Sequence, residues 1–237
     1  MVNLSVNINK IATLRNARGG NVPDILKVAV DCQNFGADGI TIHPRPDERH
    51  ITKNDVFNLK PLVHKEYNIE GYPSREFIDM VISVNPNQVT LVPDGPNVLT
   101  SNAGWDTIKQ HNFLSEIISE FKENKIRTSI FIEPDLKMIE YAKLCGSDRI
   151  ELYTENYAID YNINKEKAIH AYKKAAKFAL DLDLGVNAGH DLNLENLEFF
   201  VKNIPNLAEV SIGHALISDS IYLGLENTVQ MYKRICL

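Results

Sequence analysis

The sequence predicts a (β/α)8 barrel, the TIM-barrel fold, built as a single domain over residues 1–237. Short runs rich in β-branched residues recur eight times along the chain, and segments with helical spacing lie between them. Strands that alternate with helices pair in parallel through right-handed crossovers, and eight such units in about 240 residues match this fold. The strands are expected at residues 4–9, 39–44, 68–73, 88–93, 127–133, 149–154, 185–190 and 209–214.

Apolar spacing and capping residues predict the helices between these strands. The segment 23–35 begins with Pro23, which suits a first helical turn, and Gly36 supplies a C-terminal cap. Ser74 is expected to cap the helix that follows the third strand. Further helices are expected at 113–123, 164–182 and 220–235, with an extra helix after the loop that follows the fourth strand.

A doubly wound open sheet is the main alternative fold. That fold usually carries a glycine-rich phosphate loop after its first strand. Here the first strand is followed by NKIATLRNARGG, which contains neither GxGxxG nor GxxxxGK. The missing motif favours the barrel.

Composition and charge argue against several classes of protein. Apolar residues make up 44% and charged residues 24%, the balance of an ordinary globular protein. The net charge of -6 argues against general nucleic-acid binding. No stretch reaches the roughly 18 apolar residues of a membrane span, and MVNLSVNINK has no signal-peptide pattern. Cys32, Cys145 and Cys236 match no metal spacing and are interpreted as buried reduced thiols, which suits the cytoplasm.

Polar residues gather where the predicted strands end, which is where TIM barrels place their active sites. A typical barrel interior is filled by branched apolar side chains, so titratable groups at one end indicate a function more than a structural need. Any one of them alone is equally well explained as a satisfied polar residue. The group comprises Asn7, Asn9, His43, His50, Glu70, Glu151, His190 and His214. The remaining histidines, His64, His111 and His170, fall in segments interpreted as helical.

The residue types in this group favour proton transfer. Histidine titrates near neutral pH, and burial raises the pKa of a glutamate toward that range. His43, Glu70 and His190 lie on different strands and would face one cavity from different sides. Nucleophilic hydrolysis fits less well, because the chain has no GxSxG motif and no cysteine at a strand end.

Two anion sites are expected at the same end of the barrel. Gly213 precedes a predicted helical turn after strand 8, where backbone N–H groups bind phosphate in this fold. Arg18, Arg45 and His50 form the second basic group, and arginine pairs bidentately with phosphate. The neighbouring Asp47, Glu48 and Arg49 are interpreted as a solvated loop.

The long segment after the fourth strand, LVPDGPNVLTSNAGWDTIKQ, is interpreted as a lid or binding loop. Thr100 and Ser101 within it are candidate anion ligands.

The chain resembles the pyridoxine 5'-phosphate synthase family of vitamin B6 biosynthesis. The motifs that carry the resemblance are VNINKIATLRNARGG, GADGITIHPRPDERHIT, LVPDGPNVLT, RIELYT, VNAGHDL and IGHALI, which follow one another over nearly the whole chain. The resemblance implies a cytoplasmic homo-octameric transferase with no metal and no cofactor. Its two substrates would be 1-deoxy-D-xylulose 5-phosphate and 3-amino-2-oxopropyl phosphate.

The resemblance also implies a role for each matching residue. His43 and Glu70 would be general bases, His190 the general acid, and Glu151 would stabilise a transition state. The deoxyxylulose phosphate would contact Asn7, Asn9, Lys10, Arg18, Arg45, His50 and Thr100, and the aminooxopropyl phosphate would lie near Asp191, Gly213 and His214. The chain departs from the family pattern at Asn9-Lys10, where Asp-His is usual, and at Asp191, where glycine is usual.

Two alternatives of other classes remain open from the residues alone. A metal-dependent barrel aldolase or epimerase would use His43, Glu70, His190 and His214 as ligands. A non-catalytic phosphate-binding barrel would bind both substrates without turnover.

Overall fold

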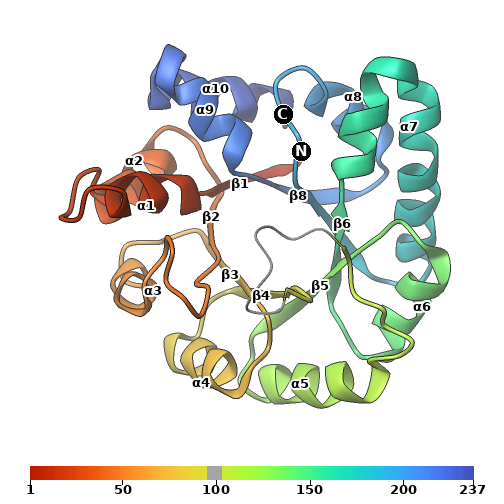
Figure 1. Cartoon of the computed structure of the whole chain (residues 1–237). Helices are drawn as coiled ribbons and strands as arrows, with labels where there is room; N and C mark the ends of the chain where they lie inside the picture. Colours follow the sequence, from red (N-terminus) through yellow and green to blue (C-terminus); the bar gives the residue numbers. More distant parts are fainter. Residues whose placement is uncertain (95–102) are drawn as a thin grey trace.

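The computed structural model describes residues 1–94 and 103–237 and shows a closed barrel of eight parallel strands in chain order (Figure 1). β1 pairs with β8, and Ser5 lies opposite Ser211 where the barrel closes. The predicted barrel is confirmed, although β3 and β8 lie two residues earlier than expected. The strands are β1 (Asn3–Asn7), β2 (Gly39–Ile42), β3 (Glu66–Gly71), β4 (Gln88–Leu91), β5 (Arg127–Ile132), β6 (Arg149–Tyr153), β7 (Gly185–Gly189) and β8 (Leu207–Ile212).

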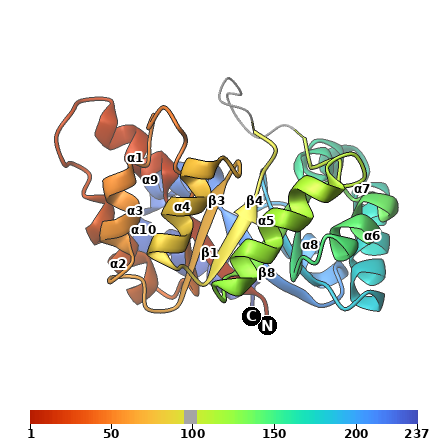
Figure 2. The same cartoon turned by 90° about the horizontal axis from the view of Figure 1, so that it is seen from below.

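Ten helices of the described chain cover the outside of the barrel (Figures 1 and 2). Both chain ends lie together at one end of it (Figure 2), where the Val2 N–H donates to the Cys236 carbonyl at 2.8 Å. The helices are α1 (Asn9–Asn16), α2 (Ile25–Asn34), α3 (Lys53–Leu59), α4 (Arg75–Val84), α5 (His111–Glu123), α6 (Leu136–Leu144), α7 (Glu155–Asp181), α8 (Leu197–Asn203), α9 (His214–Leu223) and α10 (Leu225–Ile235).

Local sequence signals fix several helix ends. The helix expected from Pro23 begins two residues later, at Ile25, because the Asp24 carboxylate caps it by accepting hydrogen bonds from two backbone N–H groups of the first turn. Gly36 follows the other end of α2 with φ +117°, a conformation that glycine adopts without strain. Ser74 caps α4 as predicted, with its hydroxyl accepting from the Phe77 N–H at 3.3 Å.

Three helix predictions need correction. The helix predicted at 164–182 begins nine residues earlier, at Glu155, and its backbone is interrupted at Asn164. The helix predicted at 220–235 is two helices, because Gly224 with φ +78° separates α9 from α10. The extra helix expected after the fourth strand is not found among residues 103–126, where α5 is the one helix described. There the Trp105 N–H donates to a strand carbonyl and the Thr107 hydroxyl to the Met138 carbonyl, which holds the segment in turns.

The outward faces of the strands carry the hydrophobic core. Leu4 and Val6 of β1 and Ile40 and Ile42 of β2 are fully buried against apolar side chains of the surrounding helices. Each such side chain contributes roughly 1.5–3 kcal/mol when it is removed from water. The hydrophobic core therefore forms a layer around the barrel, between its strands and the surrounding helices.

The inward faces are polar, so the expectation of a branched apolar interior is wrong for this chain. The hydroxyls of Ser5 and Thr41 lie 2.7 Å apart, and the Thr90 hydroxyl donates to the Asn68 side chain at 3.1 Å. At the amino-terminal end of the strands, Arg127 donates to the Gln88 side chain at 2.9 Å and forms an ion pair with a carboxylate of β3. Buried polar groups that hydrogen-bond across strands are tolerated in a barrel interior.

Candidate active site

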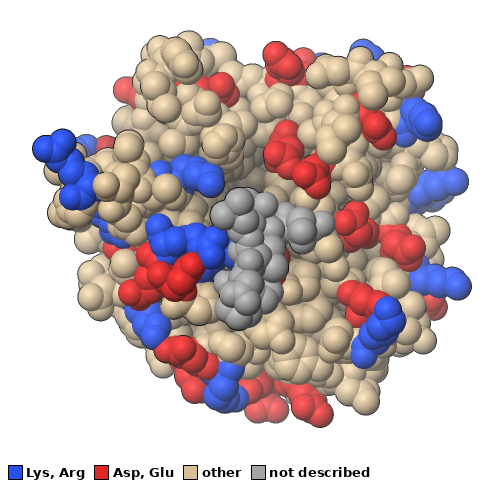
Figure 3. Space-filling view, viewed as in Figure 1, with Lys and Arg blue, Asp and Glu red and all other residues tan. Residues whose placement is uncertain are grey.

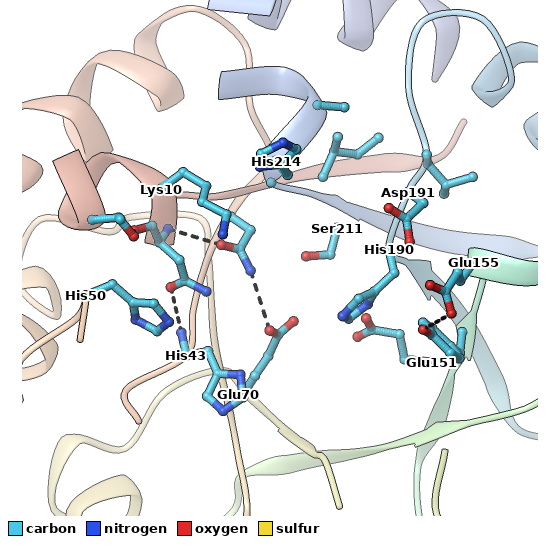
Figure 4. Close-up of a pocket in the computed structure, with 18 of the residues that line it drawn as sticks. Lys10, His43, His50, Glu70, Glu151, Glu155, His190, Asp191, Ser211 and His214 are labelled. Carbon is cyan, nitrogen blue, oxygen red and sulfur yellow. Dashed lines mark hydrogen bonds between the residues drawn. The ribbon is translucent and has the colours of Figure 1, made fainter. Parts of the chain in front are cut away.

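A cavity of about 780 Å³ lies at the carboxyl ends of the strands (Figure 4). Every predicted site residue except Arg18, Thr100 and Ser101 lines it. Arg18 is exposed on the segment after α1, and Thr100 and Ser101 lie outside the described residues. The predicted residues that line the cavity are Asn7, Asn9, Lys10, His43, Arg45, His50, Glu70, Glu151, His190, Asp191, Gly213 and His214.

Two asparagines connect β1 to the proposed bases. The Asn9 side-chain oxygen accepts from the His43 backbone N–H at 2.9 Å, and the Asn7 oxygen accepts from the Asn9 N–H at 3.1 Å. The Asn7 amide donates to the Glu70 carboxylate at 3.5 Å. These contacts (Figure 4) place His43 and Glu70 on one side of the cavity.

His43 lies buried in positively charged surroundings. Burial holds the pKa of His43 well below its usual value, and the charges of Arg45 and His50 lower it further. The rings of His43 and His50 meet edge to face with centroids 6.4 Å apart. The neutral imidazole of His43 is therefore the favoured form, as a general base requires.

His50 is oriented as a hydrogen-bond donor toward the cavity. Its Nδ1 accepts from the Ile51 N–H at 2.9 Å, which assigns the ring proton to Nε2 in the neutral form. Burial, followed by the charges of Arg45 and Lys10, lowers the pKa of His50 to about 4.

A buried ion pair holds Arg45. Its guanidinium contacts the Asp94 carboxylate at 2.7 Å, and both side chains are almost fully buried. Asp94 was not predicted from the sequence, because it lies 49 positions from Arg45 and resembles an ordinary residue of a Pro-Asp-Gly turn.

Two buried carboxyl groups, Glu70 and Glu151, also line the cavity (Figure 4). Burial, followed by the charge of Glu151, raises the pKa of Glu70 well above its usual value. Burial likewise raises the pKa of Glu151, against a hydrogen bond from Thr90. A Cβ on Gly189 would lie 2.4 Å from the Glu151 carboxylate, so Glu151 occupies space that only glycine leaves open.

His190 directly follows β7 on the opposite side of the cavity, in negatively charged surroundings. Its ring packs against Phe131 and Tyr153, with centroid distances of 4.8 and 5.3 Å. Burial lowers the pKa of His190, whereas the charges of Asp191, Asp94 and Glu155 raise it.

The start of α9 forms another wall of the cavity. Gly213 precedes the helix, and a Cβ there would lie 3.1 Å from the Asn7 Cβ, so β1 and β8 approach closely at this point. The first turn of a helix presents backbone N–H groups that have no partner within the helix. Gly213, His214 and Ala215 line the cavity at this turn, which is an arrangement suited to an anion.

Charge differs between two sides of the cavity. Lys10 lies on one side, and Glu155 and Asp191 lie on the other (Figure 4). Arg45 and Arg49 also line the cavity, and their charges act on His43. On the face shown in Figure 3, basic side chains gather on the left beside a group of acidic ones, and further acidic side chains lie on the right.

Several lining residues were not predicted from the sequence: Thr13, Arg49, Tyr153, Glu155, Asn193 and Ser211. Arg49 was assigned to a solvated loop, whereas it lines the cavity and pairs with Asp47 at 2.7 Å. Asp47 and Glu48 are exposed, as expected. Strand alternation was the available signal for Ser211, which lies two residues before Gly213 and so shares its face.

Comparison with known proteins identifies the family. The family model of the pyridoxal phosphate biosynthesis protein PdxJ matches residues 4–237. The chain belongs to the PdxJ family. Its motif-based assignment to pyridoxine 5'-phosphate synthases is thereby confirmed.

Curated relatives of this PdxJ chain agree over their full length. It is 62% identical to pyridoxine 5'-phosphate synthase of Bacteroides fragilis over 100% of both chains. It is 63% identical to pyridoxine 5'-phosphate synthase of Flavobacterium johnsoniae over 98% of both. Phosphoribosylanthranilate isomerase from Thermotoga maritima shares the fold, with a TM-score of 0.63 at 15% identity over 100% of this chain and 98% of that one.

The part of the chain that the structure describes contains no group of three or more His, Cys, Asp or Glu residues arranged to hold a metal ion. The metal-dependent alternative required such a group from His43, Glu70, His190 and His214. Among the described residues, no helix has the length and apolar character needed to cross a membrane.

Proposed function

We propose that the cavity condenses 1-deoxy-D-xylulose 5-phosphate with 3-amino-2-oxopropyl phosphate to give pyridoxine 5'-phosphate, inorganic phosphate and water, without a metal or cofactor. The observation that carries this proposal is the convergence of His43, Glu70 and His190 on one cavity. Lys10, Arg45 and the start of α9 line the same cavity, which supports binding of two phosphates. Names of the full-length relatives support the same product.

The charged walls suggest how the substrates bind. Lys10, Arg45 and the Nε2–H of His50 suit the phosphate of the deoxyxylulose substrate. The start of α9, at Gly213 and His214, suits the phosphate of the aminoketone. Its amine would then face the carboxylate of Asp191, the residue that replaces the usual glycine.

The proposed mechanism assigns proton transfers to the buried groups. The amine attacks the ketone of the sugar phosphate, and loss of water gives an imine. His43 and Glu70 remove protons to form enamine and enol intermediates, inorganic phosphate leaves, and water adds to the carbon that the phosphate has left. The enamine carbon then attacks the second ketone, and His190 protonates the two hydroxyls that depart as water while Glu151 stabilises the charge that develops. Formation of the aromatic ring makes the last step irreversible.

Glu70→Gln tests this mechanism. The amide keeps the size of the side chain but cannot accept a proton, so kcat should fall by about 10²–10⁴-fold while both substrates still bind. The measurement is formation of pyridoxine 5'-phosphate and release of phosphate, with binding followed by calorimetry. Glu116→Gln on the exposed face of α5 is the matched control.

Three outcomes would contradict the proposal. Near-normal turnover of Glu70→Gln would remove the role of Glu70. Binding of both substrates by the unmodified chain without turnover would favour the non-catalytic barrel. Activity lost to a chelator would favour the metal-dependent alternative.

We also propose a homo-oligomer, an octamer by family resemblance, in the cytoplasm. Large apolar side chains on the outer surface support association, with Ile163 81%, Ile221 77% and Tyr222 85% exposed. Three buried free cysteines fit a reducing compartment. Sedimentation of the purified chain measures its assembly, and a monomer would contradict the proposed octamer.

A further inference from the structure

Thr154 occupies a helix cap without capping the helix. It is fully buried between β6 and α7, where a threonine normally accepts a hydrogen bond from the first turn of the helix. Its side chain makes no such bond. Instead its hydroxyl lies 2.6 Å from the Gly189 carbonyl and also contacts the His190 carbonyl. Its backbone N–H donates to the Gly189 carbonyl at 3.1 Å, so the residue contacts the end of β7 rather than its own helix.

The turn that Thr154 contacts has an unusual backbone. His190 has φ +78° and Asp191 has φ +57°, and residues other than glycine rarely adopt this backbone conformation. On the far side of this turn, the buried Asn196 amide donates to the Asp191 carbonyl at 3.0 Å. Three successive carbonyls, from Gly189 to Asp191, are thus bound by side chains. Such a conformation persists only when its surroundings determine it, and it is often found at functional sites.

The direction of the His190 ring depends on this turn. The ring lies between Phe131 and Tyr153, and the Tyr153 carbonyl accepts from the Tyr172 hydroxyl at 2.9 Å. Thr154 directly follows Tyr153 but does not itself line the cavity. Any effect of Thr154 on the reaction must therefore pass through its neighbours.

We propose that Thr154 is a positioning residue that aims the imidazole of His190 into the cavity through hydrogen bonds to the 189–190 carbonyls. This inference rests on the proposed role of His190 as general acid. Without the hydroxyl, the turn keeps the hydrogen bond from Asn196 but loses those from Thr154. The His190 ring then turns away from the direction in which it can donate a proton to the substrate.

Thr154→Val removes the hydroxyl while keeping the shape of the side chain. We expect kcat to fall by about 100-fold, the size of effect that a small misplacement of a catalytic group produces, with little change in KM. The alkaline limb of the kcat–pH profile should move to higher pH, because a looser turn relieves the burial that lowers the pKa of His190. Thr154→Ser keeps the hydroxyl and should restore most of kcat.

Thr228→Val is the matched control. Thr228 is also fully buried, and its hydroxyl donates to the Gly224 carbonyl at 2.8 Å in α10, away from the cavity lining. It should lower the melting temperature without moving the pH profile. If Thr154→Val lowers stability in the same way and leaves kcat and the profile unchanged, Thr154 is only structural and the proposal fails. Thr154→Ala serves as a second variant if the valine variant does not fold.

His190→Gln separates this proposal from the proposed function. Full activity of His190→Gln would overturn the role of His190 itself. An inactive His190→Gln beside a fully active Thr154→Val would overturn the role of Thr154 alone. If Thr154 acts through His190, Thr154→Val should cost little further activity in the His190→Gln background. Equal losses in both backgrounds would contradict the proposal.

Discussion

His43 and His190 lie on opposite sides of one cavity and differ mainly in the charges around them. Arg45, His50 and Arg49 act with burial to lower the pKa of His43. Carboxylates instead oppose the effect of burial on His190. Both pKa values lie below the usual value, that of His43 well below it, and groups whose pKa values are held apart by their surroundings suit opposite roles in proton transfer. The comparison favours His43 as the base and His190 as the acid.

The largest expected effect comes from removing each imidazole in turn. His43→Gln and His190→Gln should each lower kcat by about 10²–10⁴-fold. Loss of a base should remove the acid limb of the kcat/KM–pH profile, and loss of an acid should remove the alkaline limb. His170→Gln on the exposed face of α7 is the control. If both variants lose the same limb, the two histidines do not have opposite roles.

Asp94→Asn should affect both sides of the cavity, because Asp94 pairs with Arg45 on one side and raises the pKa of His190 on the other. Breaking a buried ion pair on one side costs about 3–5 kcal/mol, so the free energy of unfolding should fall by an amount of that order in urea titrations. Asp79→Asn removes one carboxylate of an exposed ion pair with Arg75 and should change stability far less. If both substitutions lower the free energy of unfolding equally, the buried Arg45–Asp94 pair stabilises the protein no more than the exposed pair does.

Asp191→Asn should change the charge on the acidic side of the cavity alone. Removing this carboxylate removes the largest influence that raises the pKa of His190, so the pKa falls further and less imidazolium remains near neutral pH. We expect kcat above neutral pH to fall by up to about tenfold, the effect of one pKa unit, and the optimum to move to lower pH. Asp181→Asn at the far end of α7 should leave the profile unchanged. An optimum that moves upward would contradict the assignment.

Arg49→Gln should give the smallest effect, on the basic side. Arg49 is the last of the charges that lower the pKa of His43, so its removal should raise that pKa slightly. The acid limb of kcat/KM should then move upward in pH, with a change of about twofold near neutrality. Arg234→Gln on α10 is the control, and an acid limb that moves downward would be the contrary result.

Strand ends were predictable from the sequence, because β-branched runs and the residues that terminate them are local features. His43, Glu70 and His190 could therefore be assigned to one end of the barrel. Contacts between distant segments could not be predicted in this way: Asp94 and Thr154 become informative only when folding brings them to Arg45 and His190.

The polar interior was predictable but was missed. Runs such as LSVN and ITIH alternate apolar and polar residues, whereas parallel strands that are buried on both faces usually form continuous apolar runs. That alternation places Ser5 and Thr41 inside the barrel. Helix boundaries were harder to predict, because Gly224 and Asn164 interrupt helical patterns that would otherwise continue.

Closure of the barrel by β1 and β8 has a consequence for protein synthesis. Asn7 and Gly213 form one wall of the cavity, yet they are translated more than 200 residues apart. A nascent chain therefore cannot complete the site until its last strand has left the ribosome. Pairings this distant in sequence are slow to form, and β1 must keep an unpaired edge throughout elongation. A chain truncated before β8 should therefore contain an open sheet and have no complete active site, rather than a closed barrel with reduced activity.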